Sequence, residues 1–158
     1  MKLFREMRRK DKSGSQELAV KLLTGTNEGY LSTISVDNGY PAIICVNHYY
    51  DGEYIYFHSA KSGHKIDNII ANEKVCFMVT DGIEVKPKAY ATKYRSVVVY
   101  GSASLVEDKE NKKEILYKLS NKFVGKFIST FTSQLAGSLD VTSIIKIKIN
   151  HITVKEAK

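Results

Sequence analysis

The chain of 158 residues is long enough for one compact domain, and its 43% apolar content is sufficient for a hydrophobic core. No apolar run approaches the roughly 18 residues that span a bilayer, and the charged segment 1–12 does not resemble a secretory signal. The net charge is +7, of which residues 1–12 contribute +4. We therefore expect a single cytoplasmic domain over residues 1–158, with a basic N-terminal arm at 1–14 and no membrane partner.

The basic arm could contact nucleic acid or another anionic surface. The rest of the chain is only mildly basic and carries no nucleic-acid-binding motif, so we expect no nucleic-acid partner and favour a solvated or dimer-edge arm. Cys45 and Cys76 both lie in apolar, strand-like contexts. We interpret them as free thiols of a reducing compartment.

The first half of the chain predicts one helix followed by a β-meander. An apolar face at 18–23 predicts a helix over 15–24, with Ser15 as its N-cap. β-rich runs at 30–36 and 40–50 flank Asp37-Asn38-Gly39, a hairpin signal associated with a type I′ turn. A second turn at 51–52 leads into a strand at 54–58.

The second half alternates between helices and strands. Apolar spacing predicts a helix over 62–72 with Ser62 as its cap, followed by a strand at 75–80 and a polar loop at 81–88. A strand is expected at 96–106, where Gly101 marks a bulge or a close approach. A helix at 108–124 carries a Glu114–Lys118 pair, and alternating residues predict a last strand at 141–154.

Six short-looped strands and three helices make the protein mainly β. Regular strand–helix alternation is absent, so a doubly wound sheet is disfavoured. We predict a six-stranded antiparallel split β-barrel with Greek-key elements and peripheral helices.

The most informative segment runs from Tyr54 to Lys65, where a strand ends, a turn passes through Gly63 and a helix begins. Free backbone amides at a helix N-terminus attract anions. Side chains that donate hydrogen bonds to phosphate surround this point, namely Ser59, Lys61, His64 and Lys65. The alternative is a charged helix start that points into water. No P-loop is present, and no His/Cys spacing suggests a metal site.

Several motifs, in order from about Met7 to Lys158, carry a resemblance to a known family. The specific ones are Tyr56-Phe-His-Ser-Ala-Lys61, Gly63-His-Lys-Ile-Asp-Asn68 and Thr92-Lys-Tyr-Arg-Ser-Val97. The sequence resembles the flavin-binding pyridoxamine 5′-phosphate oxidase-like split barrels, in the branch that contains nitroimidazole-reductase (Nim-type) proteins. It departs from that branch at Cys45, where proline is frequent, and at Val154, where glycine is common.

The resemblance implies FMN as the cofactor and a homodimer with shared FMN sites. Ser59, Ala60, Lys61, His64 and Lys65 would surround the FMN phosphate. The strand with Cys45, Val46 and Asn47 would run along the isoalloxazine ring. Residues from the second subunit would complete the site, namely Tyr94, Arg95 and Ser96.

His58 would face the flavin, either as a catalytic residue that binds substrate or delivers a proton, or as a group that supports the phosphate site. His48 could line the same cavity, although core packing or a dimer-interface role is favoured. The chain lacks the arginine- and lysine-rich substrate clamp of the pyridoxamine 5′-phosphate oxidases themselves, which argues against vitamin B6 oxidation.

The leading functional hypothesis is an FMN-dependent oxidoreductase that reduces a small oxidised, nitroaromatic-like compound with reduced nicotinamide as donor. The sequence itself carries no nicotinamide fingerprint. One alternative is a non-catalytic flavin-binding or storage protein. Others are a split barrel that uses haem or a deazaflavin, and a nucleic-acid-associated regulator that uses the basic arm.

Overall fold

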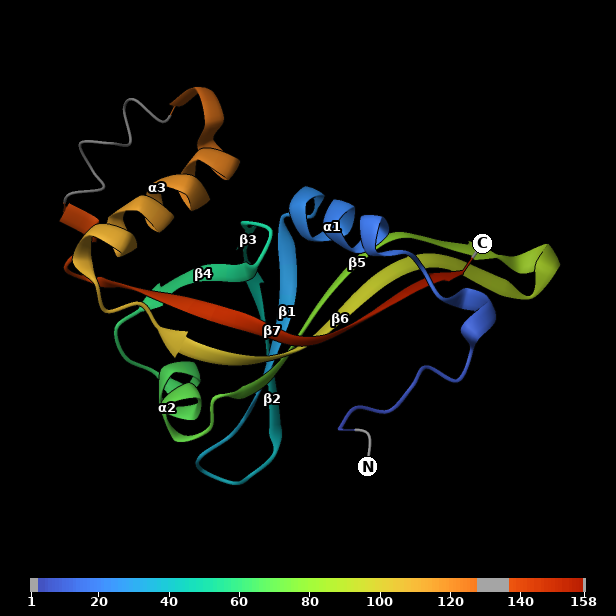
Figure 1. Cartoon of the computed structure of the whole chain (residues 1–158), viewed down its shortest axis with the longest axis horizontal. Coiled ribbons are helices and arrows are strands. Elements are labelled where there is room, and N and C mark those ends of the chain that lie inside the picture. The colour runs from blue at the N-terminus through green and yellow to red at the C-terminus, as the bar shows by residue number, and fades with distance from the viewer. Residues whose placement is uncertain (1–2, 128–136, 158) are drawn as a thin grey trace.

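The computed structural model describes residues 3–127 and 137–157 and is dominated by one antiparallel sheet (Figure 1). The strand order is β2-β1-β5-β6-β7-β4-β3. The strands are β1 (Glu28–Ile34), β2 (Pro41–Asn47), β3 (Tyr49–Tyr50), β4 (Tyr54–Ala60), β5 (Lys74–Lys86), β6 (Ala91–Leu105) and β7 (Thr142–Ala157). The helices are α1 (Gln16–Gly25), α2 (His64–Ala71) and α3 (Lys109–Val124), with short 3₁₀ turns at Lys10–Lys12, Pro87–Ala89 and Gly125–Phe127.

The sheet coils into a split barrel that does not close. β1 pairs with β5, and β4 pairs with β7, so strands distant in sequence become neighbours as in a Greek key. β2 and β4 lie beside each other without strand pairing, so the predicted β-meander does not extend from β2 to the strand at 54–58. The predicted fold class, mainly β with peripheral helices in a split barrel, is confirmed, although the described residues form seven strands rather than six.

Two apolar clusters hold the helices against this sheet. α1 packs Ala19, Leu22 and Leu23 into the main core against residues such as Leu31 and Phe77. α3 covers β4 and β7 at the other end of the molecule, in a smaller cluster built on Leu116 and Ile144 (Figure 1). The helix periodicities read from the sequence are thus confirmed, and so is the Ser15 cap, whose Oγ accepts from Leu18 N at 3.2 Å.

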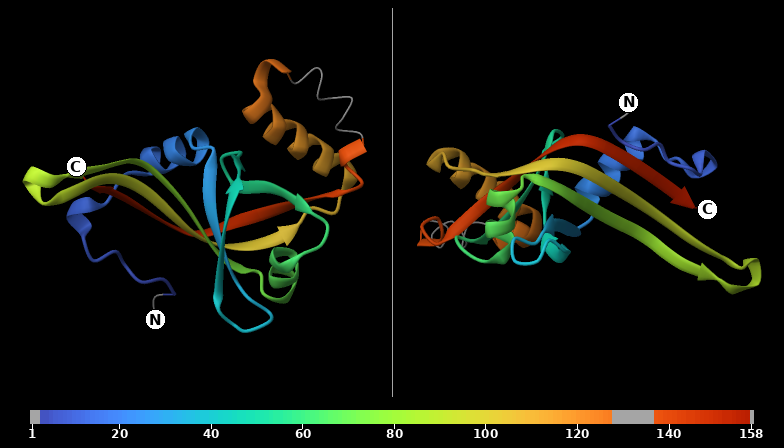
Figure 2. Two further views of the ribbon diagram at one scale, coloured as in Figure 1. Left: turned by 180° about the vertical axis from the view of Figure 1, so that it is seen from behind. Right: turned by 90° about the horizontal axis from the view of Figure 1, so that it is seen from below.

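The predicted loop at 81–88 is wrong. β5 continues to Lys86 and β6 begins at Ala91, so the two strands form a long hairpin with an irregular register between Asp81 and Glu84. Ile83 and Val85 alternate with charged residues, as in a strand. In the structure both are exposed, at 66% and 67%, so this part of the hairpin lacks the buried apolar face of the other strands. Figure 2 shows the hairpin reaching beyond the rest of the sheet.

Two turn details also differ from prediction. The 35–40 hairpin forms, with Ser35 N donating to Tyr40 O at 2.8 Å, but only Gly39 has a positive φ, which excludes the type I′ turn. α2 is capped by Gly63, with no side-chain cap bond, so Ser62 is not its cap. Gly101 is both a bulge and a close approach, because a Cβ there would lie 2.6 Å from Lys148 O.

His48 splits the predicted strand 40–50 into β2 and β3. Its backbone N–H donates to Asn27 O at 3.3 Å, and Lys122 Nζ donates to its carbonyl at 2.9 Å. Its ring Nε2 lies 2.8 Å from Leu23 O, and the ring packs edge-on against Phe77. These contacts take the residue out of the strand ladder. His48 is fully buried in the core, which is the role that the sequence favoured.

This histidine makes stability depend on pH. Burial, reinforced by the charge of Lys122, lowers the pKa of His48 from its usual 6.5 to about 4. As pH falls from 6.5 to 4 the unfolded chain takes up the proton first, so the folded state loses about 3 kcal/mol from this group. We expect His48→Gln to remove that part of the acid destabilisation, measured by urea unfolding between pH 7 and pH 4. If the unfolding free energy falls between pH 7 and pH 4 by the same amount in His48→Gln as in the wild type, His48 is not the source of this acid destabilisation.

Candidate functional site

Ser59 lies near the end of β4, where the strand is about to turn toward α2. It is opposite Ser143 of β7 and is only 5% exposed. Its hydroxyl Oγ has no hydrogen-bond partner among the residues that the structure describes. A buried hydroxyl without a partner is unfavourable by about 1–3 kcal/mol, so Ser59 Oγ is a donor for which the described residues supply no acceptor.

The next helix begins four residues beyond Ala60, the last residue of β4. Gly63 takes the N-cap position with a φ of +126°, a backbone conformation suited to glycine. Its carbonyl accepts from Ile66 N at 2.8 Å and from Asp67 N at 3.1 Å. The amides of the first α2 turn have no side-chain cap, which leaves the helix N-terminus open to an anion.

Lys65 brings a positive charge to this turn. Burial lowers the pKa of its ammonium from the usual value, and it forms no ion pair with a carboxylate within 3–127 or 137–157. His58 on β4 is exposed as a residue, but neighbouring atoms partly desolvate its ring. This desolvation and the charge of Lys65 lower the pKa of the imidazole. The imidazole is therefore neutral at pH 7, with one nitrogen able to donate a hydrogen bond and one able to accept.

His64 has partners on the neighbouring hairpin. Its Nε2 lies 3.0 Å from Ser35 Oγ and 3.3 Å from the carboxylate of Asp37. These contacts tie the start of α2 to the 35–40 hairpin. Through these contacts, the hairpin holds the His64 ring in place beside the first turn of α2.

Asn68 is a buried anchor of α2 that the sequence reading missed. Its amide donates to Thr33 Oγ1 at 3.0 Å and its oxygen accepts from Val36 N at 2.9 Å. The residue is fully buried between the apolar Ile66 and Ile69. A polar side chain between two residues of an apolar helix face was the available signal, because such a residue needs partners inside the protein.

The predicted ring-binding strand lies across the split of the barrel from β4. On β2, Val46 is buried whereas Cys45 and Asn47 are exposed. Asn47 Nδ2 donates weakly to Asn27 O at 3.4 Å. β2 is an edge strand and lies beside β4, to which it is not paired, across the opening of the barrel.

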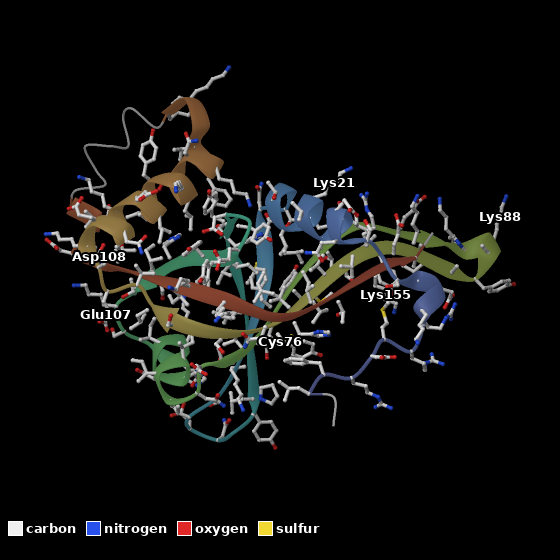
Figure 3. The ribbon with its side chains drawn as sticks, in the orientation of Figure 1. Lys21, Cys76, Lys88, Glu107, Asp108 and Lys155 are labelled. Carbon is white, nitrogen blue, oxygen red and sulfur yellow. The ribbon has the colours of Figure 1, made fainter. Side chains whose placement is uncertain are left out.

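The chain does not bring Tyr94, Arg95 and Ser96 to this turn. Tyr94 pairs with Ala157 at the C-terminal end of β7, and the Nζ of Lys155 lies 5.3 Å from the centroid of its ring. Arg95 forms an ion pair with Asp81, and Ser96 is buried. Figure 3 places Lys155 and Lys88 at one end of the molecule and Glu107 and Asp108 at the other, where β4 ends.

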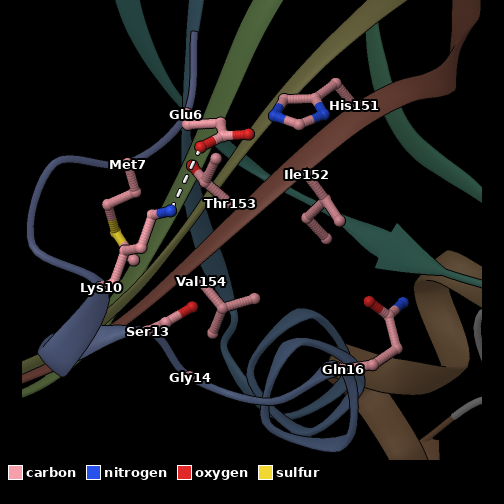
Figure 4. Close-up of a pocket in the computed structure, with 10 residues that line it drawn as sticks. All are labelled: Glu6, Met7, Lys10, Ser13, Gly14, Gln16, His151, Ile152, Thr153 and Val154. Carbon is pink, nitrogen blue, oxygen red and sulfur yellow. Dashed lines mark ion pairs between the residues drawn. The ribbon is translucent and has the colours of Figure 1, made fainter. Parts of the chain in front are cut away.

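Cavities elsewhere in the chain involve other residues. The N-terminal arm and β7 enclose a cavity of about 480 Å³, with Glu6 and Lys10 paired at 3.4 Å on its rim (Figure 4). Another cavity of about 860 Å³ extends from Phe4 to Cys76. Neither is lined by a residue predicted to bind flavin. Residues 60–64 of the β4–α2 turn are exposed.

The arm itself is partly neutralised. Arg9 pairs with Asp11, and Phe4 stacks on His151 with the ring centroids 4.6 Å apart. Within 3–127 and 137–157, no group of three His, Cys, Asp or Glu side chains could hold a metal ion. In the same residues no helix is long and apolar enough to span a membrane.

Three solved structures share this fold. The first is a flavocytochrome from Azotobacter vinelandii, with a TM-score of 0.80 and 21% sequence identity over 97% of this chain and 72% of that one. The second is an FAD and haem binding protein from Mycobacterium smegmatis, with a TM-score of 0.74 and 18% identity over 93% of this chain and 73% of that one. The third is a candidate 5-nitroimidazole antibiotic resistance protein from Bacteroides thetaiotaomicron, with a TM-score of 0.73 and 16% identity over 89% of this chain and 83% of that one. At these identities the likeness establishes the fold alone.

The sequence comparison is more specific. No curated protein sequence matches the chain. Residues 15–156 match the sequence profile described as pyridoxamine 5′-phosphate oxidase. Because this match spans nearly the whole chain, the protein belongs to the pyridoxamine 5′-phosphate oxidase family.

Proposed function

We propose that the protein is an FMN-binding flavoprotein that reduces small oxidised compounds of the nitroaromatic type, with reduced nicotinamide as the electron donor. The observation that carries the proposal is the buried, unpartnered hydroxyl of Ser59 next to an open helix N-terminus and the partly desolvated Lys65. A phosphate monoester would supply the acceptor oxygens that these donors lack. Membership of the family and the flavin-related names of two structurally similar proteins support a flavin as the source of that phosphate.

The residues around the turn fit such a cofactor in distinct ways. Ser59, Lys65 and the first amides of α2 would hold the phosphate, with Ala60, Lys61 and His64 beside it. On β2, the segment of Cys45, Val46 and Asn47 would lie along the ring. Flavin, when bound, supplies two-electron chemistry between a nicotinamide and an acceptor. The neutral His58 would donate a hydrogen bond to the oxidised group of a substrate at the opening.

A second copy of the chain would complete each site. Tyr94, Arg95 and Ser96 lie at the far end of β6 from the β4–α2 turn, so they could reach a flavin only in another subunit. Residues 60–64 of the turn are also exposed in the single chain, which suits a site covered by a partner. We therefore propose a homodimer with two shared sites.

Ser59→Ala gives the sharpest test of the phosphate site. Removing a buried hydroxyl that has no partner should leave the flavin-free protein equally stable or up to about 1 kcal/mol more stable. The same change should weaken FMN binding, and Lys65→Met should weaken it by about 1–3 kcal/mol. Fluorescence quenching of added FMN and thermal unfolding measure the two effects.

Lys88→Met is the matched control for the lysine variant, because it removes one exposed charge from the distant β5–β6 hairpin. It should leave FMN affinity unchanged. Unaltered FMN affinity in both Ser59→Ala and Lys65→Met would show that the phosphate binds elsewhere. A wild-type protein that takes up no flavin would refute the proposed function as a whole, and a Soret band in its absorbance would favour haem.

Turnover separates an enzyme from a flavin store. Under anaerobic conditions, the flavin-loaded protein should oxidise reduced nicotinamide only when a nitroaromatic compound is added, as followed by nicotinamide absorbance. His58→Asn should lower kcat by about tenfold or more while flavin content stays constant, because the hydrogen bond acts on the reacting group. Full flavin occupancy without turnover on any nitroaromatic acceptor would favour the storage role.

Subunit complementation tests the shared site. A Ser59→Ala/Lys65→Met protein and a Tyr94→Ala/Arg95→Met protein should each bind FMN poorly. After unfolding and refolding together, half of the dimers should be mixed and contain one intact site, which restores about a quarter of the wild-type sites. Each variant refolded alone is the control. A mixture that forms mixed dimers but regains no FMN binding would contradict shared sites.

A further inference from the structure

We propose that the β5–β6 hairpin of each chain covers the flavin site of its partner in the homodimer, where Ile83 and Val85 form an apolar wall against the bound substrate. This inference rests on the proposed function, because it concerns the same shared site. It adds a segment that no sequence motif assigned, and it gives a role to apolar side chains that the single chain leaves exposed.

The end of the hairpin has only two strands. β7 pairs with β6 no further along the hairpin than Tyr94, which lies opposite Ala157, and β1 pairs with β5 no further than Met78. Among the described residues, 82–93 therefore have no third strand beside them, and they project from the rest of the sheet (Figure 2). A two-stranded ribbon is marginally stable in water unless one face packs against another layer. The hairpin therefore needs a second layer over one of its faces.

One face of this ribbon is apolar, and it is the face that carries Tyr94. Val85 pairs with Thr92, so the two side chains lie on the same face. Successive side chains of a strand alternate between faces, which adds Ile83 on β5 and Tyr94 on β6 to that face. Ile83 and Val85 are 66% and 67% exposed. The opposite face carries charged side chains, namely Asp81, Glu84, Lys86, Lys93 and Arg95.

The position of Tyr94 identifies a second copy of the chain as the layer that covers the apolar face. The same alternation places Tyr94 on the side of the sheet away from the core, which holds Val97 and Val99. In the proposed homodimer Tyr94 reaches the flavin of the partner. Side chains two positions apart on one face of a strand are separated by about 7 Å. Ile83 and Val85 would therefore lie beside the flavin ring, where an apolar wall excludes water and contacts the aromatic body of a substrate.

Cross-linking to Cys45 of the partner subunit tests this placement without flavin chemistry. Cys45 is exposed on β2, the strand proposed to run along the ring. In a Cys76→Ser background, Val85→Cys treated with a short bis-maleimide should give a covalent dimer, and a further Cys45→Ser change should abolish it. Val20→Cys is the matched control, because Val20 is an exposed valine of α1, which packs on the core side of the sheet. It should give no covalent dimer.

Steady-state kinetics test the contact with substrate. Val85→Ser should raise the KM for a nitroaromatic acceptor by about fivefold to tenfold, because part of the apolar contact is lost. It should change FMN affinity by less than about twofold, because the phosphate contacts lie on β4 and α2. Val20→Ser should change neither quantity.

The outcomes separate the hairpin from the flavin site. A protein that sediments as a dimer but gives no Cys45-dependent cross-link from Val85→Cys would overturn the placement while leaving the flavin site intact. An unchanged KM in Val85→Ser at full FMN content would overturn the substrate contact. A flavin-loaded monomer would overturn the hairpin cover together with the shared site. A wild-type protein that takes up no flavin would refute the proposed function and this inference with it.

Discussion

The buried amide of Asn68 fixes the geometry on which the candidate site depends. Its two hydrogen bonds, to Thr33 and to the backbone of Val36, lock α2 to the end of β1 and to the hairpin that follows. α2 has only eight residues and would not be stable as an isolated helix. With its C-terminal half held this way and His64 bound to Ser35 at its start, the open amides and Lys65 are kept at the end of β4. Ser59 is placed there independently by the pairing of β4 with β7.

The Ser59 hydroxyl is one of three buried side-chain atoms without a hydrogen-bond partner among the described residues, the others being His48 Nδ1 and His151 Nε2. In several other parts of the chain, charges are paired locally, as in Arg9 with Asp11, Lys86 with Glu84 and Arg95 with Asp81. At the turn, Lys65 forms no ion pair with a described residue, and the Ser59 hydroxyl has no acceptor there. Such an arrangement lowers the stability of the ligand-free fold, and anion binding would recover that stability.

Much of the fold could be predicted because local patterns agreed with the tertiary structure. Periodicity located α1, α2 and α3, and turn residues located the hairpins around Asn38-Gly39 and Asp51-Gly52. The failures have physical causes. The β5–β6 hairpin extends beyond the core, so Ile83 and Val85 are exposed and do not continue the buried apolar face by which the rest of β5 is recognised as a strand. The break at His48 depends on the hydrogen bond that its N–H donates to Asn27 O and on the one that its carbonyl accepts from Lys122, and both partners are distant in sequence. For the site, the motif placed Ser59 near a strand end and Lys65 at a helix start, as the structure has them, whereas the partners of Asn68 at Thr33 and Val36 are known only from the folded chain.

The candidate site thus combines the open N-terminus of α2, the buried Ser59 hydroxyl and the partly desolvated Lys65. The central claim is that the turn binds the phosphate of a flavin through Ser59 and Lys65, and a crystal structure of the flavin complex tests it most directly. The account predicts a phosphate oxygen within hydrogen-bond distance of Ser59 Oγ, Lys65 Nζ and the first amides of α2. A flavin phosphate bound away from β4 and α2, with the Ser59 hydroxyl still unpartnered, would contradict it.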